Sequence, residues 1–250
     1  MGELLRGWRE RRRLTQLDLS LQAEVSARHL SFIETGRARP TSEMILRLSE
    51  ELEVPLRERN ALLLAGGFAP VFPEHGLDDP SLDAVRGALR QVLIGHEPHP
   101  AVVIDHHWRL VDANSGIGLF TAGVAAELLA PPINVLRLSL HPDGMAPRIV
   151  NLGEWRAHLL ARLARQAAQT ADPELAALHE ELAGYPGGTG PEPHRHDVVV
   201  PLRYRHGERE LSFLSLTAVF GTPLDVTVAE LAIESFYPAD AATTEFLRGS

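Results

Sequence analysis

The sequence predicts an α+β fold: five short helices in the N-terminal third, followed by a PAS-like antiparallel sheet packed against helices. Two observations lead to this prediction. Helix caps, apolar periodicity and stop signals agree with one another throughout residues 3–65. Beyond residue 100, the segments typical of strands and helices come in the order of two strands, a helical middle and three strands.

Local signals mark the ends of the five helices. Thr15 and Asp18 have the spacing of a capping box, so the second helix is expected to start near Thr15. Ser26 is suited to cap the third, and Gly36 to end it in a left-handed conformation. The fourth is expected to open at 40–42 and the fifth at Pro55, because proline fits the first turn of a helix.

Composition and charge narrow the functional classes. The 250 residues contain no cysteine, which excludes disulfides, Cys-ligated zinc and thiol nucleophiles. No apolar run is long enough for a membrane helix, and no signal peptide is recognisable, so we expect a cytoplasmic protein. The net charge is −9, yet residues 1–40 hold eight arginines against five acidic residues, a charge of +3. This asymmetry indicates either a nucleic-acid-binding module or a solvated helix face.

The second and third helices are separated by a turn of about three residues, which is typical of a helix-turn-helix. The stretch 15–36 resembles the Cro/repressor-type helix-turn-helix of the XRE family. Leu19, Val25, Leu30 and Ile33 match the positions that pack the two helices together. Glu24 departs from the pattern, because that family usually has glycine in the turn, and it is expected to hold a left-handed conformation or to alter the turn.

The resemblance implies roles for residues on and around the third helix. Arg28 and Phe32 would face base edges, with a place in the core as the less favoured alternative for Phe32. Gln16 would contact a phosphate, and the residues just past the third helix would contact the backbone. The predicted DNA-contacting set is Gln16, Ala27, Arg28, His29, Ser31, Phe32, Thr35, Arg37 and Arg39. His29 either contacts DNA or caps the turn, and Glu34 is expected to pair with an arginine of the first helix.

We expect a helix-turn-helix domain at 1–70, a linker at 71–81 and a second domain at 82–250. In that domain the expected helices are near 82–93, at 116–130, at 153–169 and from Pro173. The expected hairpins pair 101–105 with 109–114 and 198–204 with 211–216. Residues 231–237 are expected to form a last strand, or else a helix. This order is that of a PAS-like domain.

Three segments of the second domain, 134–142, 220–227 and 236–243, resemble the MmyB-like ligand-binding domain, which in bacteria follows an XRE helix-turn-helix. The junction at 37–66 is similar as well. The resemblance implies a transcriptional regulator that senses a small apolar ligand, with a fatty-acid-like occupant suggested for the fold. It implies no cofactor.

Apolar side chains of the second domain either fill a core or line a cavity for such a ligand. With two groups that could meet an acidic head group, Arg137 and His141, the predicted ligand-binding set is Ile104, Leu110, Phe120, Arg137, His141, Trp155, Leu159, Phe213 and Leu216.

Enzyme motifs are absent from the sequence: there is no G-x-S-x-G, no H-E-x-x-H and no lysine for a Walker loop. The histidine clusters at 96–99, 106–107 and 194–196 are interpreted as solvated loop residues rather than metal ligands. Four acidic residues have simpler roles in turns, caps and ion pairs: Asp225, Glu230, Glu234 and Asp240.

Three hypotheses follow. The first is a ligand-responsive regulator that binds an inverted-repeat operator in double-stranded DNA as a homodimer. The second is an assembly protein whose PAS-like half binds a protein partner. The third is a hydrolase hidden in the second domain. Arg28 and the arginines near the third helix favour the first, since a partner-binding helix would show more apolar surface.

Overall fold

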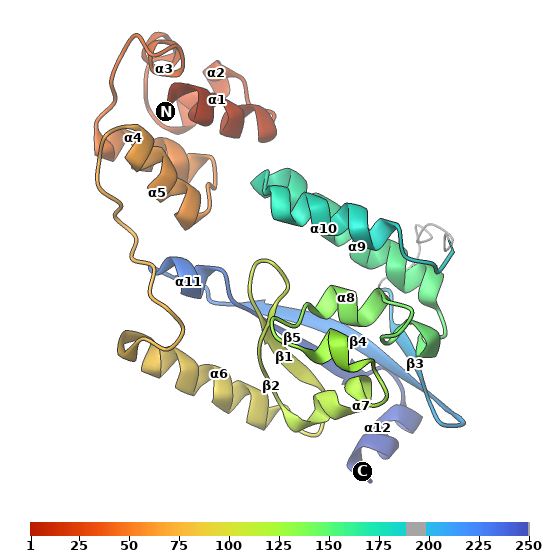
Figure 1. Cartoon of the computed structure of the whole chain (residues 1–250). Helices are drawn as coiled ribbons and strands as arrows, with labels where there is room; N and C mark the ends of the chain where they lie inside the picture. Colours follow the sequence, from red (N-terminus) through yellow and green to blue (C-terminus); the bar gives the residue numbers. More distant parts are fainter. Residues whose placement is uncertain (189–198, 250) are drawn as a thin grey trace. The chain divides into compact units, whose positions relative to one another are not determined.

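The computed structural model describes residues 1–188 and 199–249, which form two compact units (Figure 1). The first unit contains Met1–Leu77 and Thr222–Ala229, and the second contains Asp78–Gly221 and Glu230–Ser250. A short segment from the C-terminal part of the sequence thus belongs to the N-terminal unit. No helix in the described ranges combines the length and the apolar character that crossing a membrane requires.

The first unit is helical, as predicted. Its helices are α1 (Gly2–Arg11), α2 (Gln16–Gln22), α3 (Ala27–Glu34), α4 (Ser42–Glu51), α5 (Leu56–Ala65) and the short α11 (Val226–Ala229). The predicted caps are confirmed: Thr15 and Asp18 form a complete capping box, and the Ser26 hydroxyl accepts a hydrogen bond from the backbone N–H of His29. These local bonds satisfy N–H groups that a helix leaves unpaired at its start.

One apolar core joins the helices α1 to α5. It is made of Leu5, Trp8, Leu19, Ala23, Leu30, Ile33, Ile45, Leu48, Leu52, Val54, Leu62 and Leu63. The segment with α11 joins this unit through hydrogen bonds to residues 73–75. The backbone N–H of Val226 donates to Pro73, the Thr227 hydroxyl donates to the His75 carbonyl, and Asp225 lies 2.7 Å from the His75 ring nitrogen Nδ1. Asp225 also accepts from the N–H of Val228, so its predicted role in a turn and an ion pair is confirmed.

The second unit is built on a five-stranded antiparallel sheet in the order β2-β1-β5-β4-β3 (Figure 1). The strands are β1 (Ala101–Ile104), β2 (Leu110–Ala113), β3 (Leu202–His206), β4 (Arg209–Val219) and β5 (Ala232–Pro238). The predicted fold class, both hairpins and the last strand are confirmed. Val198, with which the second hairpin was expected to begin, lies outside the described residues.

Helices pack around this sheet. They are α6 (Asp83–Gly95), α7 (Gly118–Thr121), α8 (Val135–Leu140), α9 (Leu152–Thr170), α10 (Pro173–Ala183) and α12 (Ala241–Arg248). Four 3₁₀ turns accompany them: η1 (Pro80–Leu82), η2 (Ser115–Ile117), η3 (Ala126–Leu129) and η4 (Ala146–Arg148). Asp172 caps α10 and Asp240 caps α12, which confirms two predicted capping roles.

The prediction of one helix at 116–130 is wrong. The chain there forms η2, α7 and η3 in succession. Ala122 leaves the helical conformation with a ψ of 121°, and Gly123 adopts a positive φ of 69°, which glycine tolerates at little cost. The stretch also contains three glycines, at positions 116, 118 and 123, and glycine has a poor intrinsic helix propensity.

The two faces of the sheet are covered by different helices. Trp155, Leu159 and Leu163 of α9 belong to the same core as Phe213 of β4 and Ile104 of β1, so α9 covers that face. Helix α6 contacts β1, whose four residues are all buried, from the other side. The large core that holds the candidate ligand site therefore lies between the sheet and α7, α8 and α9.

Candidate functional site

Helices α2 and α3 are joined by a tight turn. Glu24 in this turn has a φ of 53°, the left-handed conformation expected for a residue in the place of the usual glycine. Leu19 of α2, Ala23 at the C-terminal end of this helix, and Leu30 and Ile33 of α3 are buried in one core with residues of α1. The turn and the buried contacts together hold α3 at a fixed angle, with its other face open to solvent.

The predicted DNA-contacting residues lie on this open face or just beyond it. Arg28, Thr35, Arg37 and Arg39 are exposed, whereas Gln16, Ala27, His29, Ser31 and Phe32 are half-buried. The Arg28 guanidinium lies 5.4 Å from the centre of the Phe32 ring, within the range of a cation–π contact. Phe32 is thus neither fully in the core nor free in solvent.

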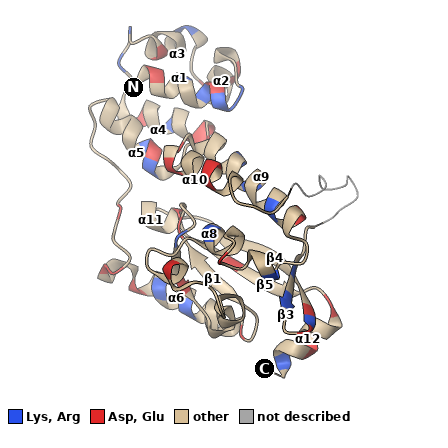
Figure 2. Cartoon of the chain, turned by 45° about the vertical axis from the view of Figure 1, so that its right-hand side comes forward, with Lys and Arg blue, Asp and Glu red and all other residues tan. Residues whose placement is uncertain are grey.

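Helix α3 and the segment that follows it carry arginines without a carboxylate partner. Within the described ranges, Arg28, Arg37 and Arg39 have no salt bridge. Figure 2 shows basic residues along the segment that follows α3. Because nothing within the unit neutralises these three guanidinium groups, their charge is available to an external anion.

Glu34 pairs with an arginine of the first helix, as expected. The Glu34 carboxylate accepts two hydrogen bonds from Arg9, at 2.6 Å to Oε1 and 2.9 Å to Oε2, and its side chain is 1% exposed. This hydrogen-bonded pairing raises the pKa of Arg9 above its ordinary value. The Gln16 side-chain amide also donates to Glu34 Oε2 at 2.7 Å. A buried ion pair therefore orients Gln16, a contact that sequence reasoning did not find.

A largely apolar cavity of about 80 Å³ lies in the core of the second unit. This volume is several times what one water molecule needs. The cavity is lined by Val102, Trp108, Leu110, Ile117, Phe120, Thr121, Leu129, Ile133, Val135, Leu136, Leu138, Ser139, Met145, Trp155, Leu159, Leu202, Glu234 and Phe236. Four residues of the predicted ligand-binding set are therefore brought together here: Leu110, Phe120, Trp155 and Leu159.

Three apolar members of the predicted set do not line this cavity. Ile104 and Phe213 are buried in the surrounding core. The prediction for Leu216 is wrong, because its side chain is 57% exposed. Side chains alternate between the faces of a strand, and Leu216 is an odd number of residues from Phe213, so it points away from the core.

Arg137 and His141 do not face the cavity either. The Arg137 guanidinium forms two hydrogen bonds to the carboxylate of Glu181 on α10, at 2.7 and 2.8 Å. This pairing raises the pKa of Arg137. The His141 ring packs edge-on against Tyr185, with ring centres 5.1 Å apart. The expectation that one of the two meets an acidic head group in the cavity is therefore wrong.

The polar groups that do reach the cavity wall were not predicted as ligand contacts. Ser139 of α8 accepts a hydrogen bond from the Trp155 indole at 3.1 Å. Glu234 of β5 accepts from Arg162 of α9 and from Ser215 of β4, both at 2.7 Å. Its expected ion-pair role is confirmed, and its partner lies 72 residues away in the sequence. The signal in the sequence was a single acidic residue in a mostly apolar strand.

Burial also disfavours the charged form of a histidine on α9, next to this ion pair. Desolvation lowers the pKa of His158, and the nearby positive charges of Arg162 and Arg165 lower it further. The His158 ring stacks on Trp155, with ring centres 5.7 Å apart. Both effects favour the neutral imidazole over a second cation on this side of the core.

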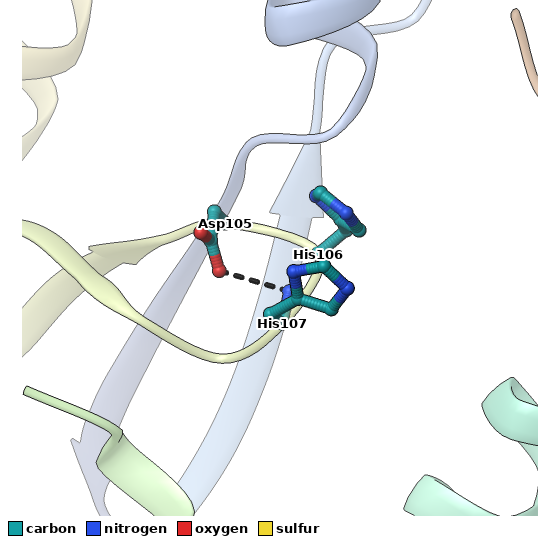
Figure 3. Close-up of side chains that lie close together, drawn as sticks. All are labelled: Asp105, His106 and His107. Carbon is teal, nitrogen blue, oxygen red and sulfur yellow. Dashed lines mark hydrogen bonds between the residues drawn. The ribbon is translucent and has the colours of Figure 1, made fainter. Parts of the chain in front are cut away.

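Figure 3 shows Asp105, His106 and His107 at the tip of the hairpin between β1 and β2. One potential ligand atom from each lies within 4.8 Å of the others. The interpretation as solvated loop histidines is wrong here, since the two rings are only 28% and 15% exposed. His106 Nδ1 lies 2.9 Å from Glu230, and His107 Nε2 lies 2.8 Å from Asp172. These contacts anchor the hairpin tip to the starts of β5 and α10.

The contact with His107 changes the pKa of the Asp172 carboxyl group. Burial raises its pKa, but the hydrogen bonds from His107 and from the Glu174 backbone outweigh that effect, so the pKa lies below its ordinary value.

The histidine cluster at 96–99 is not fully solvated either. His96 is buried, with its ring 4.6 Å from that of Tyr237, and burial lowers its pKa. The cluster at 194–196 lies outside the described residues.

Comparison with known families assigns both units. The model of the MmyB-like transcription regulator ligand binding domain matches residues 85–249, more than half of the chain, and a helix-turn-helix model matches residues 5–59. The chain belongs to the MmyB-like family. Its MmyB-like domain contains every residue that lines the cavity, and its helix-turn-helix contains α2 and α3. No curated protein matches the sequence.

The two matches agree with the resemblance found in the sequence. The chain is an XRE-type, DNA-binding transcription regulator with an MmyB-like ligand-binding domain. Both families are regulatory rather than enzymatic.

Proposed function

We propose that this regulator reads a specific DNA sequence through α3 and responds to a small, largely apolar molecule in the cavity of its MmyB-like domain. The observation that carries the DNA-binding half is the exposure of Arg28, Arg37 and Arg39 without ion-pair partners in the described ranges. In this proposal residues 1–70 bind DNA and 71–81 form a linker. Residues 82–250 sense the ligand, apart from Thr222–Ala229, which belong to the first unit. Because its target is chromosomal DNA, the protein acts in the cytoplasm.

The proposed contacts divide into base readers and backbone contacts. Arg28 lies at the exposed start of α3, and its guanidinium can form two hydrogen bonds to guanine O6 and N7. The half-buried Phe32 beside it offers an apolar edge to a thymine methyl group. Thr35, Arg37 and Arg39 follow in positions suited to phosphates, with Gln16 held toward the same helix by Glu34.

Substituting one proposed base reader and one proposed phosphate contact is expected to change DNA binding in two different ways. Arg28→Ala should weaken operator binding by about 1–3 kcal/mol and relax the preference at one base pair. Arg37→Ala should weaken binding to all sequences and reduce the slope of log affinity against log salt by about one. Fluorescence anisotropy with the operator and with single-base variants, at several salt concentrations, measures both effects.

A matched control is Arg205→Ala, which removes an exposed arginine from β3 in the MmyB-like domain. It lowers the net charge equally and is expected to leave DNA affinity unchanged. If Arg28→Ala loses affinity evenly across operator variants and scrambled DNA, Arg28 is not the base reader. If wild-type protein binds no DNA at low salt, the assembly-protein alternative replaces this proposal.

We also propose that the regulator binds an inverted repeat as a homodimer. One α3 reads only a few base pairs, and a two-fold dimer doubles that number with half-sites ~34 Å apart. The exposed Leu216 and Tyr237 lie on the same outer face of β4 and β5, which makes this face a candidate contact. Leu216→Asp is expected to shift the light-scattering mass from dimer to monomer and to weaken operator binding. A wild-type monomer with full operator specificity would contradict the dimer.

A further inference from the structure

We propose that the cavity selects a neutral, largely apolar molecule with a hydrogen-bond donor, such as a hydroxyl group, and that Glu234 accepts this hydrogen bond. The inference rests on the proposed ligand-binding function and assigns a chemical class to the ligand. It excludes a carboxylate head group inside the cavity. Three features of the structure lead to it: the cavity wall, the bonding of Glu234 and the charge balance around it.

The cavity wall offers no cation. Of the described residues that line it, Glu234 alone is charged, and most of the others are apolar. The two indole N–H groups on the wall are already used, because Trp108 donates to Gln166 at 2.8 Å and Trp155 donates to Ser139. A ligand carboxylate would therefore be buried without the paired cation that such a group requires.

Glu234 presents an oxygen that lacks a donor. Its side chain is buried, and both Arg162 and Ser215 donate to the same atom, Oε1. Within the described ranges no hydrogen bond to Oε2 is found. Oε2 is not fully enclosed, so a small donor can reach it, and a ligand that covered it without donating would leave a buried acceptor unpaired.

Arg162 cannot easily serve a second anion. Its Nη1 bonds to Glu234, its Nη2 donates to the Thr217 hydroxyl at 2.9 Å, and its guanidinium lies 4.4 Å from the centre of the Trp108 ring. The guanidinium is thereby fixed on three sides. A ligand carboxylate beside Glu234 would also place two like charges together, which disfavours the ionised form of both.

The charge balance also disfavours a cationic ligand. Arg162 and Glu234 already form a neutral pair, so an ammonium group would leave a net positive charge in an apolar core. A neutral donor satisfies Oε2 without changing this balance. A charged acceptor in an otherwise largely apolar wall also discriminates strongly against molecules of the same shape that lack the donor.

The test measures the binding of four compounds, each with eight carbon atoms, to the full-length protein. 1-Octanol and heptyl methyl ether are isomers of which only the alcohol can donate, while octanoate and octylamine carry the two charges. Affinities come from calorimetry or from displacement of a fluorescent apolar probe. We expect octanol to bind about tenfold or more tightly than the ether, as for a hydrogen bond to a charged acceptor, and octanoate to bind more weakly than octanol.

Variants identify the acceptor. Glu234→Gln is expected to reduce the preference for octanol over the ether to within about twofold. Since this change leaves Arg162 without its partner and can impair folding, a second variant combines Glu234→Gln with Arg162→Gln, a neutral pair. Circular dichroism checks the fold of each. Glu245→Gln, which neutralises an exposed carboxylate on α12 away from the cavity lining, is the control and should keep the full preference.

The outcomes separate this inference from the function on which it rests. If the ether or octanoate binds wild-type protein as tightly as octanol, or if the preference survives in a folded Glu234 variant, the inference is wrong but the cavity remains a ligand site. If none of the four compounds binds, both the inference and the ligand-binding half of the proposed function are wrong. Tight binding of octanoate alone would restore the fatty-acid-like ligand.

Discussion

Replacing Glu34 by alanine is expected to lower the free energy of unfolding of the DNA-binding unit by about 3–5 kcal/mol. The Glu34 side chain is almost fully buried, and Arg9, whose side chain is 10% exposed, would keep its charge without a partner. Gln16 would lose its acceptor as well. Urea unfolding of the full-length protein, read by hydrogen exchange of amides in α1 to α5, measures the loss in this unit separately.

Two controls sharpen this prediction. Glu43→Ala removes an exposed carboxylate that pairs with Arg47, and little change in stability is expected because exposed ion pairs contribute little. The double change of Arg9→Met with Glu34→Leu removes both charges and should recover most of the loss. If Glu34→Ala unfolds at the same urea concentration as wild type, the buried ion pair does not stabilise the unit.

Replacing Phe120 by alanine is expected to destabilise the MmyB-like domain by about 3–5 kcal/mol. The Phe120 ring is buried, with its centre 5.2–5.4 Å from those of Tyr204, Phe213 and Phe236 in edge-on contacts. Its loss removes these contacts and enlarges the cavity that it lines. Urea unfolding followed by circular dichroism measures the change.

The enlarged cavity provides a second readout. Benzene is expected to raise the melting temperature of Phe120→Ala more than that of wild type, since an apolar void can bind a small apolar molecule. Phe120→Leu leaves a smaller void and is expected to show a smaller loss of stability. A Phe120→Ala protein that unfolds like wild type would mean that the core collapses onto the vacated space.

Elements fixed by neighbouring residues could be predicted from the sequence. The caps at Thr15, Ser26 and Asp172 are examples, because each side chain bonds to a backbone group two or three residues away. The apolar stripe of Trp155 and Leu159 could be predicted for the same reason, as residues four apart share one face of a helix. These two side chains therefore lie on one face of α9, and both line the cavity.

Features that depend on distant residues could not be predicted. Leu216 and Phe213 are both apolar, and the run of six residues from Leu211 does not alternate strictly, so only the pairing of β4 with β5 decides which one faces the core. Arg137 seemed available to a ligand because its partner, Glu181, is 44 residues away on α10. The pairing of Glu234 with Arg162 could not be predicted either, because 72 residues separate them in the sequence.

The DNA-binding unit is discontinuous along the chain, with consequences for exchanging modules between regulators. Thr222–Ala229 lies between β4 and β5 in the sequence, yet belongs to the unit that contains α1 to α5. A fragment cut after Leu77 would lose the groups that bond to Pro73 and His75. A hybrid that joins these N-terminal helices to another ligand-binding domain would therefore have to carry the connection between β4 and β5 with them. Recombination at one point cannot transfer this DNA-binding unit whole.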